Sequence, residues 1–159
     1  NLRYEGFGPY NIALIIETLT DNKNRTASNI RTILQKSGGR LGETGSTSHY
    51  FYVCGVLHVA KDKISDEKIL ELSIDAGAMD CSSSSGYHEI LTKREDFYKI
   101  KSEIEKNIDN FLYSGIEWRP QTCLEISKEE SEVIIKMLET LEEDDDVQNT
   151  FVNCNIHIN

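Results

Sequence analysis

Long apolar runs are absent from this sequence. No stretch approaches the ~20 apolar residues that a membrane-spanning helix requires, and no signal peptide is visible. We therefore expect no membrane association.

Metal-binding and disulfide patterns are also lacking. The cysteines stand far apart, at Cys54, Cys81, Cys123 and Cys154, and form no CxxC pair. The four histidines show no ligand spacing, whereas a zinc site usually draws on closely spaced pairs. The pattern favours reduced cysteines in a reducing compartment. It predicts neither a metal nor another cofactor.

Catalytic motifs are missing as well, because the sequence contains no nucleophile elbow, phosphate-binding loop or zinc motif. The glycines at positions 38, 39, 42 and 45 follow a predicted helix, whereas a dinucleotide-binding loop precedes one. Paired carboxylates carry no information in a chain with 27 Asp and Glu residues. We expect no enzyme and no catalytic residues.

Positive charge is scarce but locally concentrated. The formal net charge is −10, yet residues 1–45 carry six Lys and Arg against four Asp and Glu, while the rest carries 11 against 23. The local excess consists of Lys23, Arg25, Arg31, Lys36 and Arg40. These five are candidate contacts to nucleic acid or to a partner, on a single cationic edge. The alternative is an ordinary solvated helix face.

The opening stretch predicts a buried strand followed by an amphipathic helix. Residues 12–16 form a continuous apolar run, typical of a strand buried on both faces. After a polar turn at residues 21–24, apolar residues repeat at helical spacing, at Ala27, Ile30, Ile33 and Leu34. Gly38 and Gly39 then end the helix, because glycine accepts the left-handed conformation of a helix C-terminus.

Several motifs in a fixed order make the sequence recognisable. They are YEGFGP at residues 4–9, LTDNKNRT at 19–26, GGRLGETGS at 38–46, PQT at 120–122 and DVQN at 146–149. Over residues 4–156 the chain resembles the YebC/PmpR family of bacterial proteins, which are commonly described as probable transcriptional regulators. Their mitochondrial relatives include the translational activator of cytochrome c oxidase subunit one.

The resemblance implies which partners the protein contacts, and it implies that one region of the family is missing from this chain. It implies contact with nucleic acid, DNA or RNA, or with the ribosome. Family members begin with a basic helical region, whereas this chain begins close to its first strand. The resemblance therefore implies that this region is missing here and would supply most of the contact. The family usually has a small residue where Tyr10 stands and an aromatic-Met-Phe run at residues 49–51. We expect a monomer.

Residues 56–118 predict one complete domain. The expected elements are a strand at 56–59, a helix from Ser65 to Gly77, strands at 79–81 and 87–91, a helix opened by a capping box at 92–95, and a strand at 115–118. This β-α-β-β-α-β order is that of the ferredoxin-like fold. Trp118 is expected to be buried against a helix.

The remaining residues predict a second, divided domain. The first part supplies strands at 12–16 and 46–53 around the helix, and the tail supplies strands at 122–126 and 147–154 around a helix opened by a capping box at 127–130. We predict an α+β fold of two ferredoxin-like α/β sandwiches, one inserted into the other. The domains are residues 1–54 with 120–159, and residues 55–119, with crossings at Cys54-Gly55 and Arg119-Pro120. The alternative is three βαβ-like modules in series.

Two segments allow alternative interpretations. The aromatic residues at 49–52 could stack on nucleic-acid bases, although core or cross-strand packing is favoured. The acidic run at 142–146 is interpreted as a solvated turn rather than a divalent-ion site, and the helix before it should end near residues 141–143. The predicted function is non-enzymatic regulation of gene expression through nucleic acid or the ribosome. The alternative is an acidic protein-interaction module that docks a basic partner.

Overall fold

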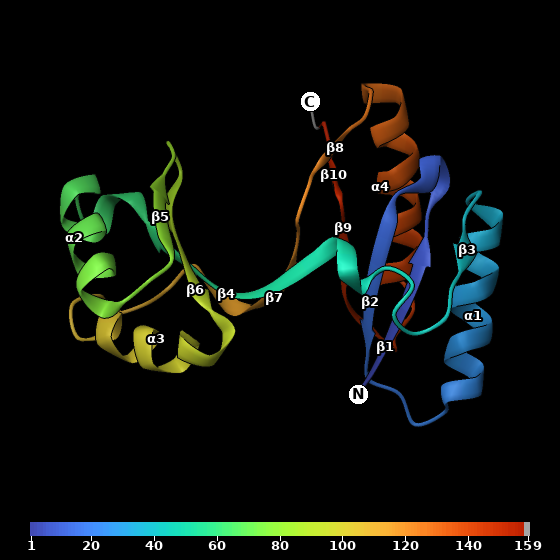
Figure 1. The fold of residues 1–159 in the computed structure, drawn as a ribbon, viewed down its shortest axis with the longest axis horizontal. Coiled ribbons are helices and arrows are strands. Elements are labelled where there is room, and N and C mark those ends of the chain that lie inside the picture. The colour runs from blue at the N-terminus through green and yellow to red at the C-terminus, as the bar shows by residue number, and fades with distance from the viewer. Residues whose placement is uncertain (158–159) are drawn as a thin grey trace. The chain divides into compact units, whose positions relative to one another are not determined.

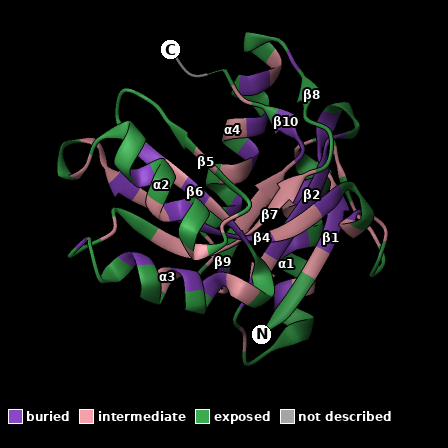
Figure 2. Ribbon diagram, turned by 60° about the vertical axis from the view of Figure 1, so that its left-hand side comes forward, coloured by how far each residue is buried: buried purple, intermediate pink, exposed green. Residues whose placement is uncertain are grey.

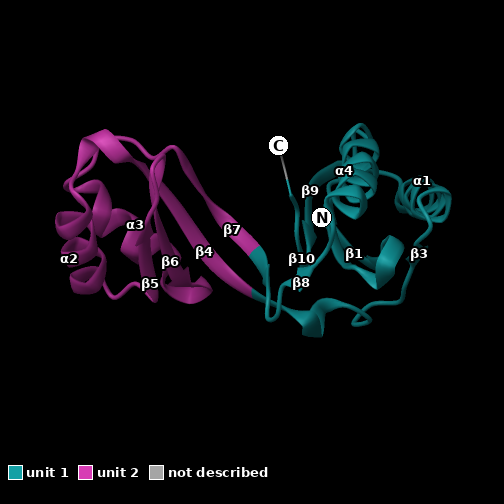
Figure 3. Ribbon diagram, turned by 90° about the horizontal axis from the view of Figure 1, so that it is seen from above, with its two compact units in different colours: residues 1–52, 118–159 teal, residues 53–117 magenta. Residues whose placement is uncertain are grey.

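The computed structural model describes residues 1–157 and forms two compact units. Unit 1 comprises residues 1–52 and 118–159, and unit 2 comprises residues 53–117 (Figure 3). The fold is α+β, with helices and two antiparallel four-stranded sheets, one in each unit. Within the described part of the chain, no helix is long and apolar enough to cross a membrane.

Unit 1 opens with a hairpin. Strand β1 (Leu2–Phe7) pairs antiparallel with β2 (Ala13–Thr18), and a 3-10 turn at Pro9–Asn11 joins them. The short β3 (Arg40–Leu41) pairs with β1, and β9 (Val147–Val152) pairs with β2, so the sheet order is β3-β1-β2-β9. The prediction that this unit consists of two β-α-β halves is wrong, because its first two strands are adjacent in sequence and in the sheet.

Helices α1 (Lys23–Lys36) and α4 (Lys128–Glu142) cover one face of this sheet and contact each other (Figure 1). Alternate residues of β2, such as Leu14 and Ile16, join Ile30 of α1 and Ile134 of α4 in one buried cluster. The other side chains of β2, Ala13 and Ile15, belong to a second cluster on the opposite face. Strand β2 is thus buried on both faces, as residues 12–16 predicted.

The helices of unit 1 begin and end where the sequence indicates. The Asn22 side chain accepts a hydrogen bond from the backbone N–H of Arg25 at the start of α1. At its end, Gly38 has φ +90° and Gly39 lies 2.7 Å (N to O) from the Leu34 carbonyl. The predicted capping box between Ser127 and Glu130 is present at the start of α4.

Three predicted strands of unit 1 differ in the structure. Residues 46–50 form a loop and a 3-10 turn at Ser48–Tyr50, and the strand predicted there begins only at Phe51. The strand predicted at 122–126 is reduced to β8 (Leu124–Glu125). This strand pairs in parallel with β10 (Cys154–Asn155), and β9 ends at Val152 instead of running to Cys154.

Unit 2 has the predicted element order. Strand β4 (Phe51–Ala60) is followed by α2 (Asp66–Ala76), β5 (Asp80–Ser83), β6 (Tyr87–Lys93), α3 (Phe97–Glu105) and β7 (Tyr113–Pro120). The sheet order is β5-β6-β4-β7. Its core joins residues of the strands and of both helices, including Leu57, Ile69, Ile90 and Ile100. Each helix is buried on one side and exposed on the other (Figure 2).

Three local predictions for this region are wrong. Strand β4 passes Cys54 and Gly55 without a break. Gly55 is needed there because a Cβ atom would lie 2.3 Å from the side chains of Phe97 and Thr92. Thr92 does not form a capping box, since its hydroxyl donates to the Lys93 carbonyl and α3 has no side-chain cap. Trp118 packs against the sheet cluster of Ala13, Ile15 and Phe51 and not against a helix.

Candidate nucleic-acid interface

The five basic residues singled out from the sequence are all exposed, but they do not form a single edge. Lys23 and Arg31 border one depression, and Arg25, Lys36 and Arg40 each border a different one. Four of them lie on α1, where side chains project in different directions around the helix axis. The predicted cationic edge is therefore divided.

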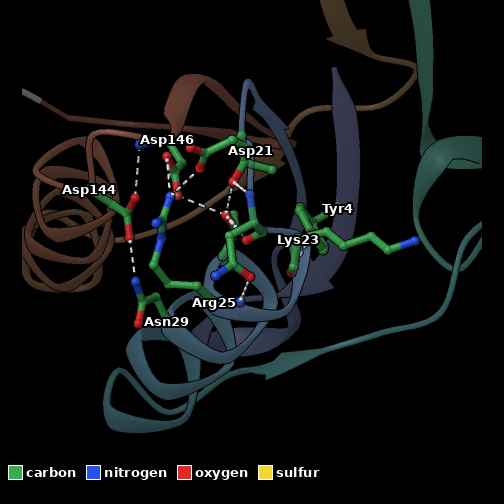
Figure 4. A network of polar contacts seen from close by, with 10 residues as sticks. Tyr4, Asp21, Lys23, Arg25, Asn29, Asp144 and Asp146 are labelled. Carbon is green, nitrogen blue, oxygen red and sulfur yellow. Dashed lines mark hydrogen bonds and ion pairs between the residues drawn. The ribbon is translucent and has the colours of Figure 1, made fainter.

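Arg25 is held by acids from two distant parts of the chain. Its Nη2 atom lies 3.2 Å from Oδ1 of Asp21 and 3.0 Å from Oδ2 of Asp146 (Figure 4). The hydroxyl of Thr26 donates to the same Asp146 carboxylate at 2.7 Å. Because its charge is compensated on two sides, Arg25 is poorly placed to attract a phosphate. We call this set of contacts the Arg25–Asp146 network.

The Arg25–Asp146 network joins two of the recognisable motifs. Hydrogen bonding from Thr26, followed by that from Arg25, lowers the pKa of Asp146 below its ordinary value. Asn29 donates its side-chain amide to Asp144 at 3.2 Å, and Asp144 accepts from the backbone N–H of Asp146 at 2.9 Å. Helix α4 ends at Glu142, in the predicted range, but the acidic run is more than a solvated turn. It binds the start of α1 to the start of β9.

Lys23 and Arg31 lie on a side of α1 that does not face the Arg25–Asp146 network. Together with Arg3 they border a depression of about 520 Å³, the Lys23–Arg31 depression. Figure 4 shows the Lys23 side chain extending away from the acids of the network. Among residues 1–157, neither Lys23 nor Arg31 forms an ion pair, although Glu43 stands on the same depression. These two cations remain available to a phosphate group.

Lys36 and Arg40 occupy separate surroundings. Lys36 lies near Lys136 of α4, beside a depression that both helices line. The guanidinium of Arg40 lies 4.4 Å from the centroid of the Phe7 ring, a cation–π contact. Neither residue is close enough to Lys23 and Arg31 to share their depression.

A buried carboxylate organises the loop that follows β3. Glu5 is 2% exposed and accepts backbone N–H bonds from Gly45 at 2.9 Å, Thr47 at 3.1 Å and Ser48 at 2.7 Å. Arg3 approaches the same carboxylate, with its Nε atom 3.5 Å from Oε2. The YEGFGP motif therefore supplies the acceptor, and Gly45 of the GGRLGETGS motif supplies a donor together with Thr47 and Ser48, which directly follow that motif.

Burial by itself would raise the pKa of Glu5, but the backbone N–H donors of Gly45, Thr47 and Ser48 outweigh it. They lower the pKa from 4.5 to about 2. The sequence analysis missed both Glu5 and Arg3 because it placed no strand at residues 2–7. The alternation of polar and apolar residues there is the signal that could have indicated one.

Residues 1–157 contain no candidate metal-binding site. No group of three or more His, Cys, Asp or Glu side chains there is arranged to hold a metal ion. Cys54 and Cys154 are buried, Cys123 is exposed, and no disulfide bond joins any of the four cysteines within the described residues. In unit 1, polar groups converge in the Arg25–Asp146 network and in the Glu5 loop.

These observations define a two-unit α+β protein whose motif-bearing segments meet in unit 1. Comparison with known proteins identifies its family. The family model described as the TACO1/YebC second and third domain matches residues 1–154. The chain belongs to the YebC/TACO1 family and corresponds to these two domains.

Individual relatives agree with this assignment. A probable transcriptional regulatory protein of Pelagibacter ubique (strain HTCC1062) is 50% identical over 159 residues, which are 100% of this chain and 66% of the relative. A protein of the same description from Zymomonas mobilis subsp. mobilis is 43% identical over 155 residues, covering 98% and 62%. The names of both relatives are those of regulators and not of enzymes.

A solved structure shares the fold. The crystal structure of a conserved hypothetical protein from Aquifex aeolicus matches with a TM-score of 0.88 and 35% sequence identity, covering 99% of this chain and 65% of that one. The chain thus spans slightly less than two thirds of the length of each of these three proteins.

Proposed function

We propose that this protein is a non-enzymatic regulator of gene expression that acts through nucleic acid. It is a DNA-binding transcriptional regulator, a ribosome-associated translational activator, or both. Membership in the YebC/TACO1 family supports the proposal, as do the names of the two bacterial relatives.

The observation that carries the proposal is the pair of cations on the Lys23–Arg31 depression. Both side chains are exposed, both lie on one concave surface, and neither is paired with an acid among residues 1–157. Binding to nucleic acid depends on neutralising phosphates, so cations that the fold leaves unpaired contribute most to it. We do not assign a phosphate contact to Arg25, because its charge is already compensated.

The overall charge limits how much contact this chain can supply. Its net charge of −10 opposes approach to a polyanion. We therefore assign it a local contact, and most of the electrostatic attraction to a basic region elsewhere in the full-length protein. The partner would be DNA, RNA or the ribosome, the active form a monomer, and the location the bacterial cytoplasm or the mitochondrial matrix.

The test uses the full-length protein and the double variant Lys23→Glu with Arg31→Glu. The wild-type protein should bind DNA or RNA, or sediment with ribosomes, at moderate salt. The double variant should bind at least 10-fold more weakly, because two phosphate contacts are replaced by repulsion. Crosslinking in cells, followed by sequencing of the bound RNA and DNA, identifies which partner is physiological. A wild-type protein that binds neither nucleic acid nor ribosomes would refute the proposal.

An acidic interaction surface is the second candidate function. The acids at Asp21 and residues 143–146 surround a depression of about 730 Å³ beside Arg25. Glu143 and Asp145 are exposed and make no ion pair within the described residues. A basic protein partner would then dock there. The variant Glu143→Lys with Asp145→Lys should abolish capture of such a partner after nuclease treatment, and unchanged capture would exclude this surface.

For the fold class, we propose the ferredoxin-like assignment for unit 2 alone. Its element order and its sheet order β5-β6-β4-β7 support this assignment. Unit 1 begins with the β1–β2 hairpin and has a different strand order.

A further inference from the structure

Another concave surface of unit 1 combines aromatic side chains with hydrogen-bond donors. This groove has a volume of about 560 Å³, within the range of ~300–1,000 Å³ that is common for ligand sites. Its lining includes Phe7, Arg40, Tyr50, Gln121 and Asn153, and we call it the Arg40–Tyr50 groove. Among the described residues, no acidic side chain lines it.

Two polar side chains of the groove, Arg40 and Asn153, offer hydrogen-bond donors. Arg40 forms no ion pair within residues 1–157, so most of its guanidinium N–H groups are open to a ligand. The side-chain oxygen of Asn153 accepts from the backbone N–H of Ala13 at 2.8 Å. Its NH₂ group is consequently the part of the amide that can serve a ligand. A donor-rich surface without carboxylates suits an acceptor-rich ligand such as a phosphate or a nucleobase carbonyl.

Aromatic rings stand beside these donors. Tyr50 is 42% exposed, and its ring centroid lies 4.1 Å from that of His49. Phe51, the next aromatic residue, is buried in the core instead. The run at residues 49–52 therefore has two roles, because Phe51 packs inside while the rings of His49 and Tyr50 remain at the surface. Exposed rings next to an arginine can stack on the bases of an unpaired strand.

The fold holds these rings in place. The Tyr50 carbonyl accepts from the backbone N–H of Gln121 at 2.8 Å, and the Gln121 side chain donates to the Phe51 carbonyl at 3.2 Å. The turn that carries Tyr50 starts at Ser48, whose N–H is bound by the buried Glu5 carboxylate. Three of the recognisable motifs, YEGFGP, GGRLGETGS and PQT, thus contribute to the groove or to its support.

The backbone of the connection between β1 and β2 is strained beside the groove. Asn11, which lines the groove, has φ +60°, and its neighbour Tyr10 has φ +62°. Consecutive non-glycine residues in the left-handed region cost energy, and such strain tends to persist where a functional surface requires it. Asparagine tolerates this conformation, whereas tyrosine rarely adopts it.

We infer that the Arg40–Tyr50 groove binds one unpaired nucleotide of a single-stranded nucleic acid. The base stacks on the exposed rings of Tyr50 and His49, and the phosphate is bound by Arg40. This inference rests on the proposed function and adds a defined contact to it. Recognition is tolerant of sequence, because every base has a face that can stack. RNA and DNA share this chemistry, so the experiment compares both.

The experiment measures binding of the full-length protein to fluorescent oligonucleotides of about ten nucleotides. The probes are single-stranded RNA, single-stranded DNA of the same sequence, and the corresponding duplex. Tyr50→Ala should weaken binding to a single strand about 10-fold, whereas Tyr50→Phe should keep it. Arg40→Gln should weaken binding and reduce the slope of log K against log salt by about 1. Tyr98→Ala, at a tyrosine that is 75% exposed in unit 2, is the matched control.

The outcomes separate this inference from the proposed function. Selective loss of single-strand binding in Tyr50→Ala and Arg40→Gln, with unaltered melting curves and an unaffected Tyr98→Ala control, supports the groove. Tighter binding to the RNA strand or to the DNA strand shows which nucleic acid supplies the bound nucleotide. If the wild-type protein binds nucleic acid but Tyr50→Ala and Tyr98→Ala bind equally well, the groove is excluded while the proposed function stands. Binding of a peptide, and of no oligonucleotide, would also overturn the inference.

Discussion

The surface around Arg25 and the groove around Arg40 belong to the same unit, yet the charges of the two arginines have opposite surroundings. Arg25 contacts two carboxylates, and Asp146 is further satisfied by Thr26. Arg40 lies over the face of the Phe7 ring and forms no ion pair within the described part of the chain. The comparison shows that an arginine in a recognisable motif can either stabilise the fold or remain available to a binding partner. Its surroundings, and not its motif, distinguish the two roles.

The same contrast extends to the rest of unit 1. The Arg25–Asp146 network fastens α1 to the segment before β9, so its charges stabilise tertiary structure. The Arg40–Tyr50 groove is carried by a loop that the buried Glu5 holds, and it leaves donors unsatisfied at the surface. Three changes test this contrast, from the largest expected effect on stability to the smallest.

The largest effect should follow Glu5→Gln, which removes the charge that holds the loop leading to Tyr50. Since the pKa of Glu5 falls from 4.5 in the unfolded chain to about 2 in the folded protein, its ionised form stabilises the fold. The stabilisation is fully present above pH 4.5 and is lost as the pH falls through 2. We expect Glu5→Gln to lower the free energy of unfolding at pH 7 by about 3 kcal/mol. Urea denaturation at pH 7 measures this loss.

The matched control for this change is Glu43→Gln, in the exposed part of the same loop. It should alter stability by less than about 0.5 kcal/mol, because surface substitutions away from a specific contact have little effect. Equal losses in the two variants would show that the loop does not depend on Glu5.

A smaller effect is expected from Asp146→Asn, which breaks the Arg25–Asp146 network. The substitution removes the charge that Arg25 binds and weakens the acceptor of the Thr26 hydroxyl. The melting temperature should fall by a few degrees at low salt, and by less at high salt, because exposed ion pairs are screened. Asp145→Asn, at the exposed neighbour, is the control and should leave it unchanged. A loss of stability that does not depend on salt would assign the role of Asp146 to its neutral hydrogen bonds.

The smallest effect has the opposite sign. Tyr10→Gly should stabilise the protein by about 0.5–1 kcal/mol, because glycine adopts φ +62° without the steric cost that tyrosine has there. The same exchange at Tyr98, an exposed position in the first turn of α3, should destabilise by about 0.5 kcal/mol, because glycine is a poorer helix former than tyrosine. Thermal melting of the two variants checks the signs. Destabilisation by Tyr10→Gly would mean that contacts of the ring outweigh the strain.

Periodic patterns in the sequence predicted much of the fold. The apolar run at residues 12–16, the stripe of α1 and the capping box of α4 each depend on neighbouring residues only, and each was found. The element order of unit 2 followed from the same local signals. Strand β1 was missed although its polar and apolar residues alternate, and the burial of its charged residue Glu5 could not be predicted without knowing the distant donors.

The candidate site was less predictable than the fold. Arg25 and Arg31 are six residues apart and therefore point about 120° away from each other on a helix of 3.6 residues per turn. This divergence could have been anticipated from the sequence. The pairing of Arg25 with Asp146 could not, because 121 residues separate the two partners. The Arg40–Tyr50 groove likewise depends on Phe7, Gln121 and Asn153, which only the tertiary structure brings together.

The most direct test of this account compares Arg31→Gln with Arg25→Gln in the full-length protein, by the salt dependence of nucleic-acid binding. Arg31→Gln should reduce the slope of log K against log salt by about 1 and leave the melting temperature unchanged, because Arg31 forms no ion pair with any residue from 1 to 157. Arg25→Gln should leave the slope unchanged and lower the melting temperature, because its charge serves the network. A reduction of the slope by Arg25→Gln as large as that by Arg31→Gln would contradict the account.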